Sequence, residues 1–441
     1  MTGRLSKVIR RADAFLIVVL IVFICAQIAV VFMYGDSYYL GDFAEMDNDD
    51  VKYVRSGLKL VEDFKLYYRN ADYEGDMASV FVMPGYPLFL AFFLKLFGAV
   101  GLSVPLTAES VAGALLAVRL VQGLLQVGVI LLLYRIGMKF FSVWVARLAI
   151  IFYVLYIPNL ETPLLILTET VFTFFFVVLL WLSLEAVASK RLRYYVGAGV
   201  VLGMAVMIRP TVLLFPLVIL LIWLLKKIPV RDMLKYALVV GCIVVAMLAP
   251  WWIRNAVEFD RFIPLTLSSG NPFMQGAFIK YDFSEMSQYL VDFPPDTDSL
   301  VTDQAEMAAG KKRLRDSWQA RPLATVCWYT WGKFAELWRF PFYTRLLGQG
   351  IFRVSFNVVT IFHWLLLGLA CLGAVVNCLK GEVNRRLKLL LPASAIYMAI
   401  VYLPYFTCAR YAYPLMPIVL LLAACGVCGV ARRLRSREVR G

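Results

Sequence analysis

Repeated runs of roughly 17 to 25 apolar residues constrain this chain most, because a helix of that length crosses the hydrocarbon core of a bilayer. The first run, 15–33, carries Gln27 as its one strongly polar residue. Its length and the lack of a clear cleavage site predict a retained helix rather than a signal peptide. The chain is 61% hydrophobic and 17% charged, which is far more apolar than a soluble domain. We therefore expect an all-α polytopic membrane protein.

Basic residues between the apolar runs predict how the chain crosses the membrane. Short loops rich in arginine and lysine stay in the cytoplasm. With about ten transmembrane helices, nearly half of the chain's 44 basic residues fall in short cytoplasmic segments, and both termini are cytoplasmic. The expected spans are 14–34, 111–134, 142–159, 170–188, 194–208, 210–225, 234–254, 351–378, 389–407 and 411–430.

Two long segments, 35–110 and 255–350, fall on the outer side in this topology. Apolar residues at helical spacing in 51–64 predict an amphipathic helix that lies in the membrane interface. The run 84–97 is too short to span and is expected to be an interfacial or re-entrant helix. The chain is thus divided into an N-terminal transmembrane catalytic module with the first outer loop, a partly helical outer loop, and C-terminal helices with a basic tail: 1–255, 256–350 and 351–441.

Composition excludes several classes of function. The single histidine, His363, lies within a span, which argues against histidine catalysis and favours a packed or hydrogen-bonded side chain. The eight cysteines lie mostly inside apolar runs and show no metal-binding framework. The net charge of +14 sits largely in membrane anchors, so no nucleic acid is expected as a partner. The basic run 311–315 is predicted to be a solvated or headgroup-facing helix, with binding of a lipid phosphate as the alternative.

Charged groups at membrane depth are costly, so each needs a partner or a function. Any one of them, taken alone, is explained as an interface anchor or a helix cap. Together they place several cations and several acids near the outer face, which indicates an anionic ligand and a proton acceptor. Arginine suits a phosphate because its fork donates two hydrogen bonds at once. The residues are Asp49, Asp50, Arg119, Glu169, Arg209, Trp251, Trp252, Arg254, Asn255, Arg410 and Tyr411.

Six motifs containing these residues resemble, in order, those of the GT-C glycosyltransferase superfamily. The similar branch includes dolichyl-phosphate-mannose protein mannosyltransferases and lipid A aminoarabinose transferases. The chain departs from the pattern at Asp260, where a glycine usually follows, and it has fewer spans than many members. The motifs lie at 49–53, 83–87, 167–170, 203–210, 249–255 and 410–414.

The resemblance implies transfer of a sugar from a polyprenyl-phosphate carrier to a glycan, lipid or protein acceptor, with inversion at the anomeric carbon. The site would lie on the periplasmic or extracellular side of the plasma (inner) membrane. Asp49 is implied as the general base, with Asp50 and Asp47 as rivals, and Glu169 as a second acid. A divalent metal between Asp49 and Glu169 is left open. The implied substrate-binding residues are Tyr53, Arg209, Trp251, Arg254, Asn255, Arg410 and Tyr411.

Two other classes of function compete with a transferase. A transporter or flippase for a lipid-linked sugar also uses intramembrane charges, but such proteins tend to have inverted repeats and charges at the bilayer midplane. This sequence has no evident repeat, and its charges cluster toward one face. A non-enzymatic scaffold would leave the ordered acids and arginines unexplained.

Overall fold

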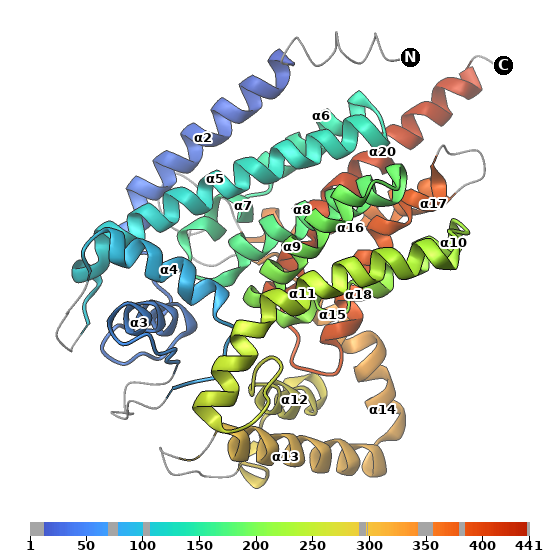
Figure 1. Cartoon of the computed structure of the whole chain (residues 1–441). Helices are drawn as coiled ribbons and strands as arrows, with labels where there is room; N and C mark the ends of the chain where they lie inside the picture. The colour runs from blue at the N-terminus through green and yellow to red at the C-terminus, as the bar shows by residue number, and fades with distance from the viewer. Residues whose placement is uncertain are drawn as a thin grey trace.

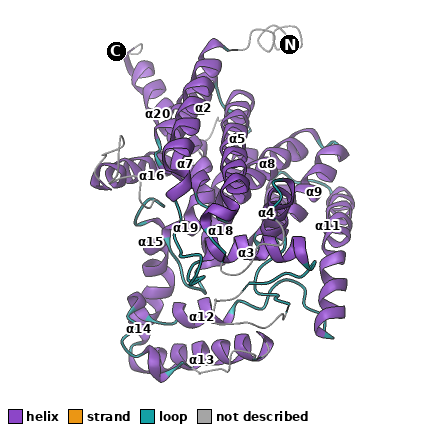
Figure 2. Cartoon of the chain, turned by 90° about the vertical axis from the view of Figure 1, so that its left-hand side faces the viewer, coloured by secondary structure: helices purple, strands orange, loops and turns teal. Residues whose placement is uncertain are grey.

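The computed structural model of the chain describes residues 13–68, 78–99, 106–290, 297, 299–342, 356–378 and 384–438. Within these ranges every regular element is a helix, and no strand occurs (Figure 2). The predicted all-α class is therefore confirmed. Parts of the expected cytoplasmic segments (1–12, 379–383 and 439–441) and of the two outer segments (69–77, 100–105, 291–296, 298 and 343–350), together with the start of the eighth span (351–355), lie outside the described residues.

Six helices of the described chain are long and apolar enough to cross a membrane, and a bent pair makes a seventh candidate. Lipid offers no hydrogen-bond partners to the backbone, and a helix satisfies its backbone groups internally. The six are α2 (Ala14–Tyr34), α5 (Ala108–Phe140), α8 (Thr168–Ser189), α11 (Val230–Phe259), α16 (Phe356–Cys378) and α19 (Ala409–Ala412) with α20 (Met416–Glu438).

The remaining predicted spans also coincide with helices, although these are shorter or bent. The bent pair turns by 67° between α6 (Val143–Leu155) and the segment 158–164. The number of ten spans remains a prediction, because the shorter helices do not meet the length criterion. They are α9 (Leu192–Ile208), η3 (Pro210–Val212) with α10 (Pro216–Leu225), and α18 (Leu390–Tyr402). The segment 158–164 of the bent pair consists of α7 (Pro158–Glu161) and η2 (Thr162–Leu164), α17 (Arg385–Lys388) precedes α18, and η9 (Tyr413–Leu415) joins α19 to α20.

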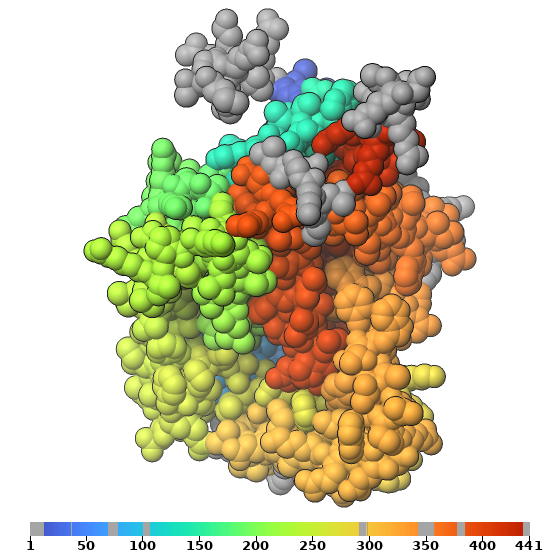
Figure 3. Space-filling model, turned by 90° about the vertical axis from the view of Figure 1, so that its right-hand side faces the viewer, coloured from blue at the N-terminus to red at the C-terminus, as the bar shows by residue number. Residues whose placement is uncertain are grey.

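The segments assigned to the outer side lie together at one end of the helical bundle. The start of α2 and the end of α20 lie at the opposite end (Figure 1). The two predicted interfacial helices are present as α3 (Asp49–Glu62) and α4 (Gly85–Leu96). The yellow and orange elements of the long outer loop cover the lower end in Figure 3. They are α12 (Gly270–Gly276), η4 (Ile279–Tyr281), η5 (Met286–Gln288), α13 (Ser299–Ala320), α14 (Pro322–Cys327), the π-helical turn Trp328–Gly332 and α15 (Lys333–Trp338).

A polar stripe on α5 supports the bend after α6. Arg119 donates to the Leu164 carbonyl over 3.0 Å, and Gln122 donates to the Pro163 and Leu165 carbonyls over 2.9 Å each. Irregular backbone inside a membrane protein needs such internal partners, because lipid offers none. Arg119 therefore holds the backbone that leads into α8. This differs from the sequence analysis, which grouped Arg119 with the residues near an anionic ligand.

His363 also has a structural place. The Tyr156 hydroxyl lies 3.0 Å from its Nδ1, and the Trp338 carbonyl lies 3.1 Å from its Nε2. The ring therefore joins α16 to the end of α15, as expected for a buried, hydrogen-bonded histidine.

Helices α16 and α20 approach each other closely through two glycines. A Cβ added to Gly373 would lie 1.8 Å from the Leu422 carbonyl oxygen, and one added to Gly426 would lie 2.3 Å from that of Leu369. Small residues allow membrane helices to approach this closely.

We expect Gly373→Val to lower the free energy of unfolding by about 1–3 kcal/mol or more, because the added side chain must push the two backbones apart. The measurement is the midpoint of thermal unfolding of the purified protein in detergent. Gly368→Val is the matched control, since a Cβ at Gly368 on the same helix meets nothing within 4 Å. Equal losses in both variants would contradict this account of the contact.

Candidate active site

Glu169 lies at the centre of a cluster of charges. Leu167 is extended and α8 begins at Thr168, so Glu169 occupies the first turn of the helix, where the helix dipole favours a carboxylate. Its side chain is fully buried and forms ion pairs with both Arg209 and Arg410. One carboxylate therefore holds two guanidinium groups in place.

Arg209 reaches Glu169 because of the proline that follows it. Pro210 disfavours helical backbone at the preceding residue, and Arg209 is extended at the end of α9. Its Nε donates to the Thr168 hydroxyl over 2.8 Å, while its Nη2 contacts Glu169. The guanidinium carbon lies 6.0 Å from the centre of the Tyr411 ring. The side chain is 11% exposed, so the arginine remains within reach of a ligand.

Arg410 joins Glu169 to Asp49. It lies in the short helix α19, which follows the extended residue Cys408. Its Nε donates to Glu169, and its Nη1 lies 2.6 Å from Asp49 Oδ2. The result is a continuous chain of opposite charges, Asp49–Arg410–Glu169–Arg209, assembled from four segments distant in sequence.

Asp49 is the accessible acid of this series of charges. It begins α3, next to the cap residue Asn48, and its side chain is 40% exposed. The Tyr68 hydroxyl donates to Asp49 Oδ1 over 2.6 Å. Burial raises the pKa of the Asp49 carboxyl, but the Arg410 charge and the Tyr68 hydrogen bond outweigh it, so the pKa lies below its usual value. Asp49 is therefore a carboxylate at neutral pH.

Tyr53 lies one turn further along α3, with its ring centre 5.1 Å from those of Tyr68 and Tyr86. Burial and the nearby Asp49 charge raise the pKa of the Tyr53 hydroxyl, which therefore stays protonated. Tyr68 is a neighbour of Asp49 that sequence reasoning missed. No motif marked it, because the contact forms only when the chain after α3 folds back.

Asp50, the predicted rival of Asp49, points elsewhere. It is buried and accepts hydrogen bonds from the backbone amides of Leu40 (2.6 Å), Gly41 (3.2 Å) and Val51 (3.0 Å). Burial raises the pKa of the Asp50 carboxyl, and these amides partly oppose the rise. Its contacts hold the connection from α2 to α3. Asp47 is likewise engaged, accepting from the amide of Asp42 over 2.8 Å.

The tryptophan–arginine–asparagine motif at the end of α11 fixes a loop. Trp251 donates to the Leu265 carbonyl over 2.8 Å, and Asn255 donates to the Ile263 carbonyl over 2.9 Å. Arg254 donates to Asn255 over 2.9 Å and lies above the Trp251 ring. None of the contacts among the described residues links Arg254 to the charge cluster, which contains the other two predicted phosphate ligands.

The cluster does not fit a divalent metal between Asp49 and Glu169. The Arg410 guanidinium contacts both carboxylates and fills the position that a metal ion would need. Across the described chain, no group of three or more histidine, cysteine or acidic side chains is arranged to hold an ion.

The fold is similar to that of an oligosaccharyltransferase of known structure. The chain resembles the oligosaccharyltransferase of Archaeoglobus fulgidus, solved with zinc and sulfate, with a TM-score of 0.53 and 15% identity. The match covers 95% of this chain and 50% of that one, so the chain spans half the length of that relative. ArnT from Cupriavidus metallidurans, bound to undecaprenyl phosphate, gives a TM-score of 0.42 at 12% identity, covering 93% and 77% of the two chains.

The sequence comparison gives a match to one family over part of the chain. Residues 82–253 match the family described as dolichyl-phosphate-mannose-protein mannosyltransferase. The matched region contains Glu169 and Arg209, whereas Asp49 and Arg410 lie outside it. No curated protein sequence matches the chain. The family match covers less than half of the chain, so it is a resemblance to that family, in the same branch that the sequence motifs resemble.

Proposed function

We propose that this protein transfers a sugar from a polyprenyl-phosphate carrier to an acceptor at the outer face of the membrane. The observation that carries the proposal is the charge chain Asp49–Arg410–Glu169–Arg209, which sets one accessible carboxylate beside two arginines. The matched family is named for an enzyme that uses dolichyl-phosphate-mannose, which supports a lipid phosphate as the leaving group.

The residues of the cluster have complementary roles in the proposed reaction. The acceptor hydroxyl or amine attacks the anomeric carbon, and its proton passes to the Asp49 carboxylate. The bond from that carbon to the phosphate oxygen breaks, and its electron pair remains on the departing polyprenyl phosphate. Arg209 and Arg410 stabilise the charge that develops on this phosphate. Direct displacement inverts the anomeric configuration.

Glu169 is a positioning residue in this mechanism. It is fully buried and pairs with both arginines, so it fixes the two guanidinium groups at the positions where the phosphate charge develops. Tyr53 and Tyr411 border the cluster and are proposed to line the donor site. Trp251 and Asn255 act through the 263–265 backbone, which they hold near the end of α11, and Arg254 supports both side chains.

We expect Asp49→Asn to lower carrier release from polyprenyl-phosphate sugars by about a hundredfold or more, because general base catalysis contributes on that scale. Asp50→Asn should lose far less, since an amide oxygen can still accept from the backbone. The measurement is carrier release by the purified protein in proteoliposomes, with cell extract as acceptor. Full activity of Asp49→Asn would contradict the base assignment.

If wild-type protein releases no carrier from any donor but scrambles lipid across the bilayer, the transporter alternative is correct.

The pH dependence of carrier release tests the pairing of Asp49 with Arg410. The base works only when deprotonated, so activity should fall as the pH drops through the pKa of Asp49. In the wild type this fall should lie below the usual aspartate value of 3.8. Arg410→Gln removes the cation, burial then dominates, and the fall should move to higher pH even though the overall rate is lower. An acid limb at the same pH in both proteins would contradict the pairing.

We infer that the site lies on the outer face, because the loops at the opposite end are basic. In a variant whose eight cysteines are replaced, a new cysteine at the exposed position Ala308 should react with an impermeant maleimide in intact cells. A cysteine at the exposed position Arg191 should react only after permeabilisation. The opposite labelling pattern would reverse the proposed orientation.

A further inference from the structure

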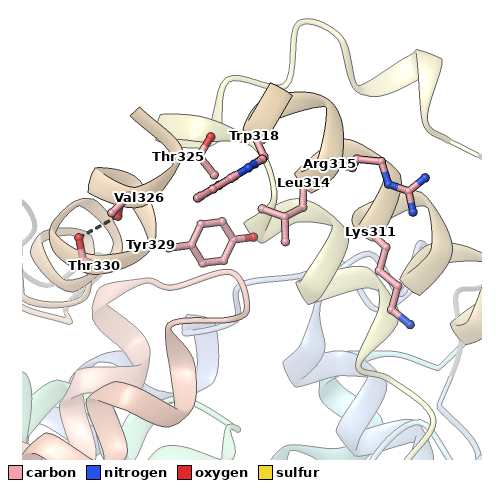
Figure 4. A pocket seen from close by; sticks show the side chains of 8 residues that line it. All are labelled: Lys311, Leu314, Arg315, Trp318, Thr325, Val326, Tyr329 and Thr330. Atoms are coloured by element: carbon pink, nitrogen blue, oxygen red, sulfur yellow. Dashed lines mark hydrogen bonds between the residues drawn. The ribbon is translucent and has the colours of Figure 1, made fainter. Parts of the chain in front are cut away.

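A groove of about 590 Å³ runs between α13 and the helix that follows it (Figure 4). On α13 its lining residues are spaced three and four positions apart, so they form one face of the helix. The opposite wall comes from the end of α14 and the adjoining turn. The lining residues are Lys311, Leu314, Arg315, Trp318, Thr325, Val326, Tyr329 and Thr330.

Two cations lie at one end of the groove. Lys311 and Arg315 are exposed, one helical turn apart, and no acid lines the groove. Neither forms an ion pair with any residue that the structure describes. Arg313 between them behaves differently, because it points to the other side and pairs with Glu285 at 2.9 Å. The basic run is thus divided, and two of its charges face the groove with no acid paired to them in the part of the chain that the structure describes.

The other end of the groove is aromatic. Trp318 is 54% exposed, and Figure 4 shows the Tyr329 side chain lying across from it between the two helices. The Tyr329 hydroxyl is buried and has no hydrogen-bond partner among the described residues. A buried polar atom normally has a partner, so this hydroxyl is available to a ligand in the groove.

The groove borders a surface suited to lipid. The helical segment from α14 to α15 exposes Leu323 (80%) and Trp331 (71%), and Val326 on the same segment also lines the groove. Large apolar residues exposed on the outer end of a membrane protein fit the interface region of the bilayer. A bound headgroup in the groove could therefore keep its acyl chains in the membrane.

The groove is connected to the charge cluster through one buried lysine. Lys333 Nζ lies 3.7 Å from the centre of the Tyr329 ring and donates to the Leu403 carbonyl over 2.9 Å. The Thr407 hydroxyl donates to the Lys333 carbonyl over 3.2 Å. The segment 403–408 leads directly into α19, which carries Arg410. A ligand against Tyr329 would thus contact the structure that positions this arginine.

We propose that this groove binds the phosphorylated headgroup of a membrane lipid, and that this lipid is the acceptor of the transfer reaction. Lys311 and Arg315 hold the phosphate, while Trp318 and Tyr329 contact the remainder of the headgroup. The binding site stands on its own residues, and its role as acceptor site rests on the proposed function.

Binding is tested on the full chain in nonionic detergent with dihexanoyl phosphatidic acid as the probe. The readout is the rise in unfolding temperature with probe concentration. Lys311→Gln combined with Arg315→Gln should weaken the apparent affinity at least about tenfold, since each cation makes a charge-assisted hydrogen bond. Lys312→Gln is the matched control, because it removes a charge from the same helix outside the groove.

Four results would overturn the binding proposal. The double variant could respond like the wild type, or Lys312→Gln could lose as much affinity as the double variant, which would indicate general surface charge. Inorganic phosphate alone could produce the full effect, which would indicate a site for free phosphate. Dihexanoyl phosphatidylcholine should give a much smaller rise, and an equal rise would exclude recognition of the anionic headgroup.

The acceptor role is tested in the transfer assay, with total membrane lipid as acceptor. Dihexanoyl phosphatidic acid should inhibit transfer in competition with the lipid extract, and the double variant should need about tenfold more of it. Inhibition that extra lipid extract does not relieve would overturn the acceptor role. If the probe binds but wild-type protein transfers no sugar from any donor, the proposed function fails while the binding site stands.

Discussion

The burial of Glu169 is the constraint on which the end of the bundle with the charge cluster depends. A carboxylate removed from water is costly unless cations and hydrogen bonds compensate it, and Glu169 has two arginines. Arg410 in turn needs Asp49, so α3, α8, α19 and the end of α9 must meet at one point. In the proposed reaction, the two arginines stabilise the charge that develops on the departing phosphate. Because Glu169 already holds them in place, they need no reorganisation during the reaction.

The bend before α8 shows how the fold supplies this arrangement. Irregular backbone at membrane depth is tolerated only where the protein itself provides hydrogen bonds. Arg119 and Gln122 of α5 provide them to the carbonyls of 163–165, so the chain can turn and start α8 where Glu169 meets the arginines. The buried polar residues of α5 thus serve the site without being part of it.

The long outer loop contacts both of the sites that we propose, the groove and the charge cluster. Its helix α13 contributes cations to the groove, and the lysine that begins α15 holds the segment leading to Arg410. A donor site at the charge cluster and an acceptor site in the groove would therefore share one connecting segment. That arrangement gives binding in the groove a physical route to the arginine beside the base.

The sequence alone determined the membrane class, the helices, and the set of charged residues that needed explanation. Hydrophobic length and short-range motifs are local properties, so Glu169, Arg209 and Arg410 could be selected without a structure. Local patterns did not separate Asp49 from Asp50, because adjacent residues on a helix point in different directions and only the packed partners decide their roles. Tertiary structure also assigned Arg119 to the backbone, added Tyr68 to the site, and left Arg254 outside the contacts of the cluster. These outcomes depend on contacts between segments far apart in the chain, which no single stretch of sequence specifies.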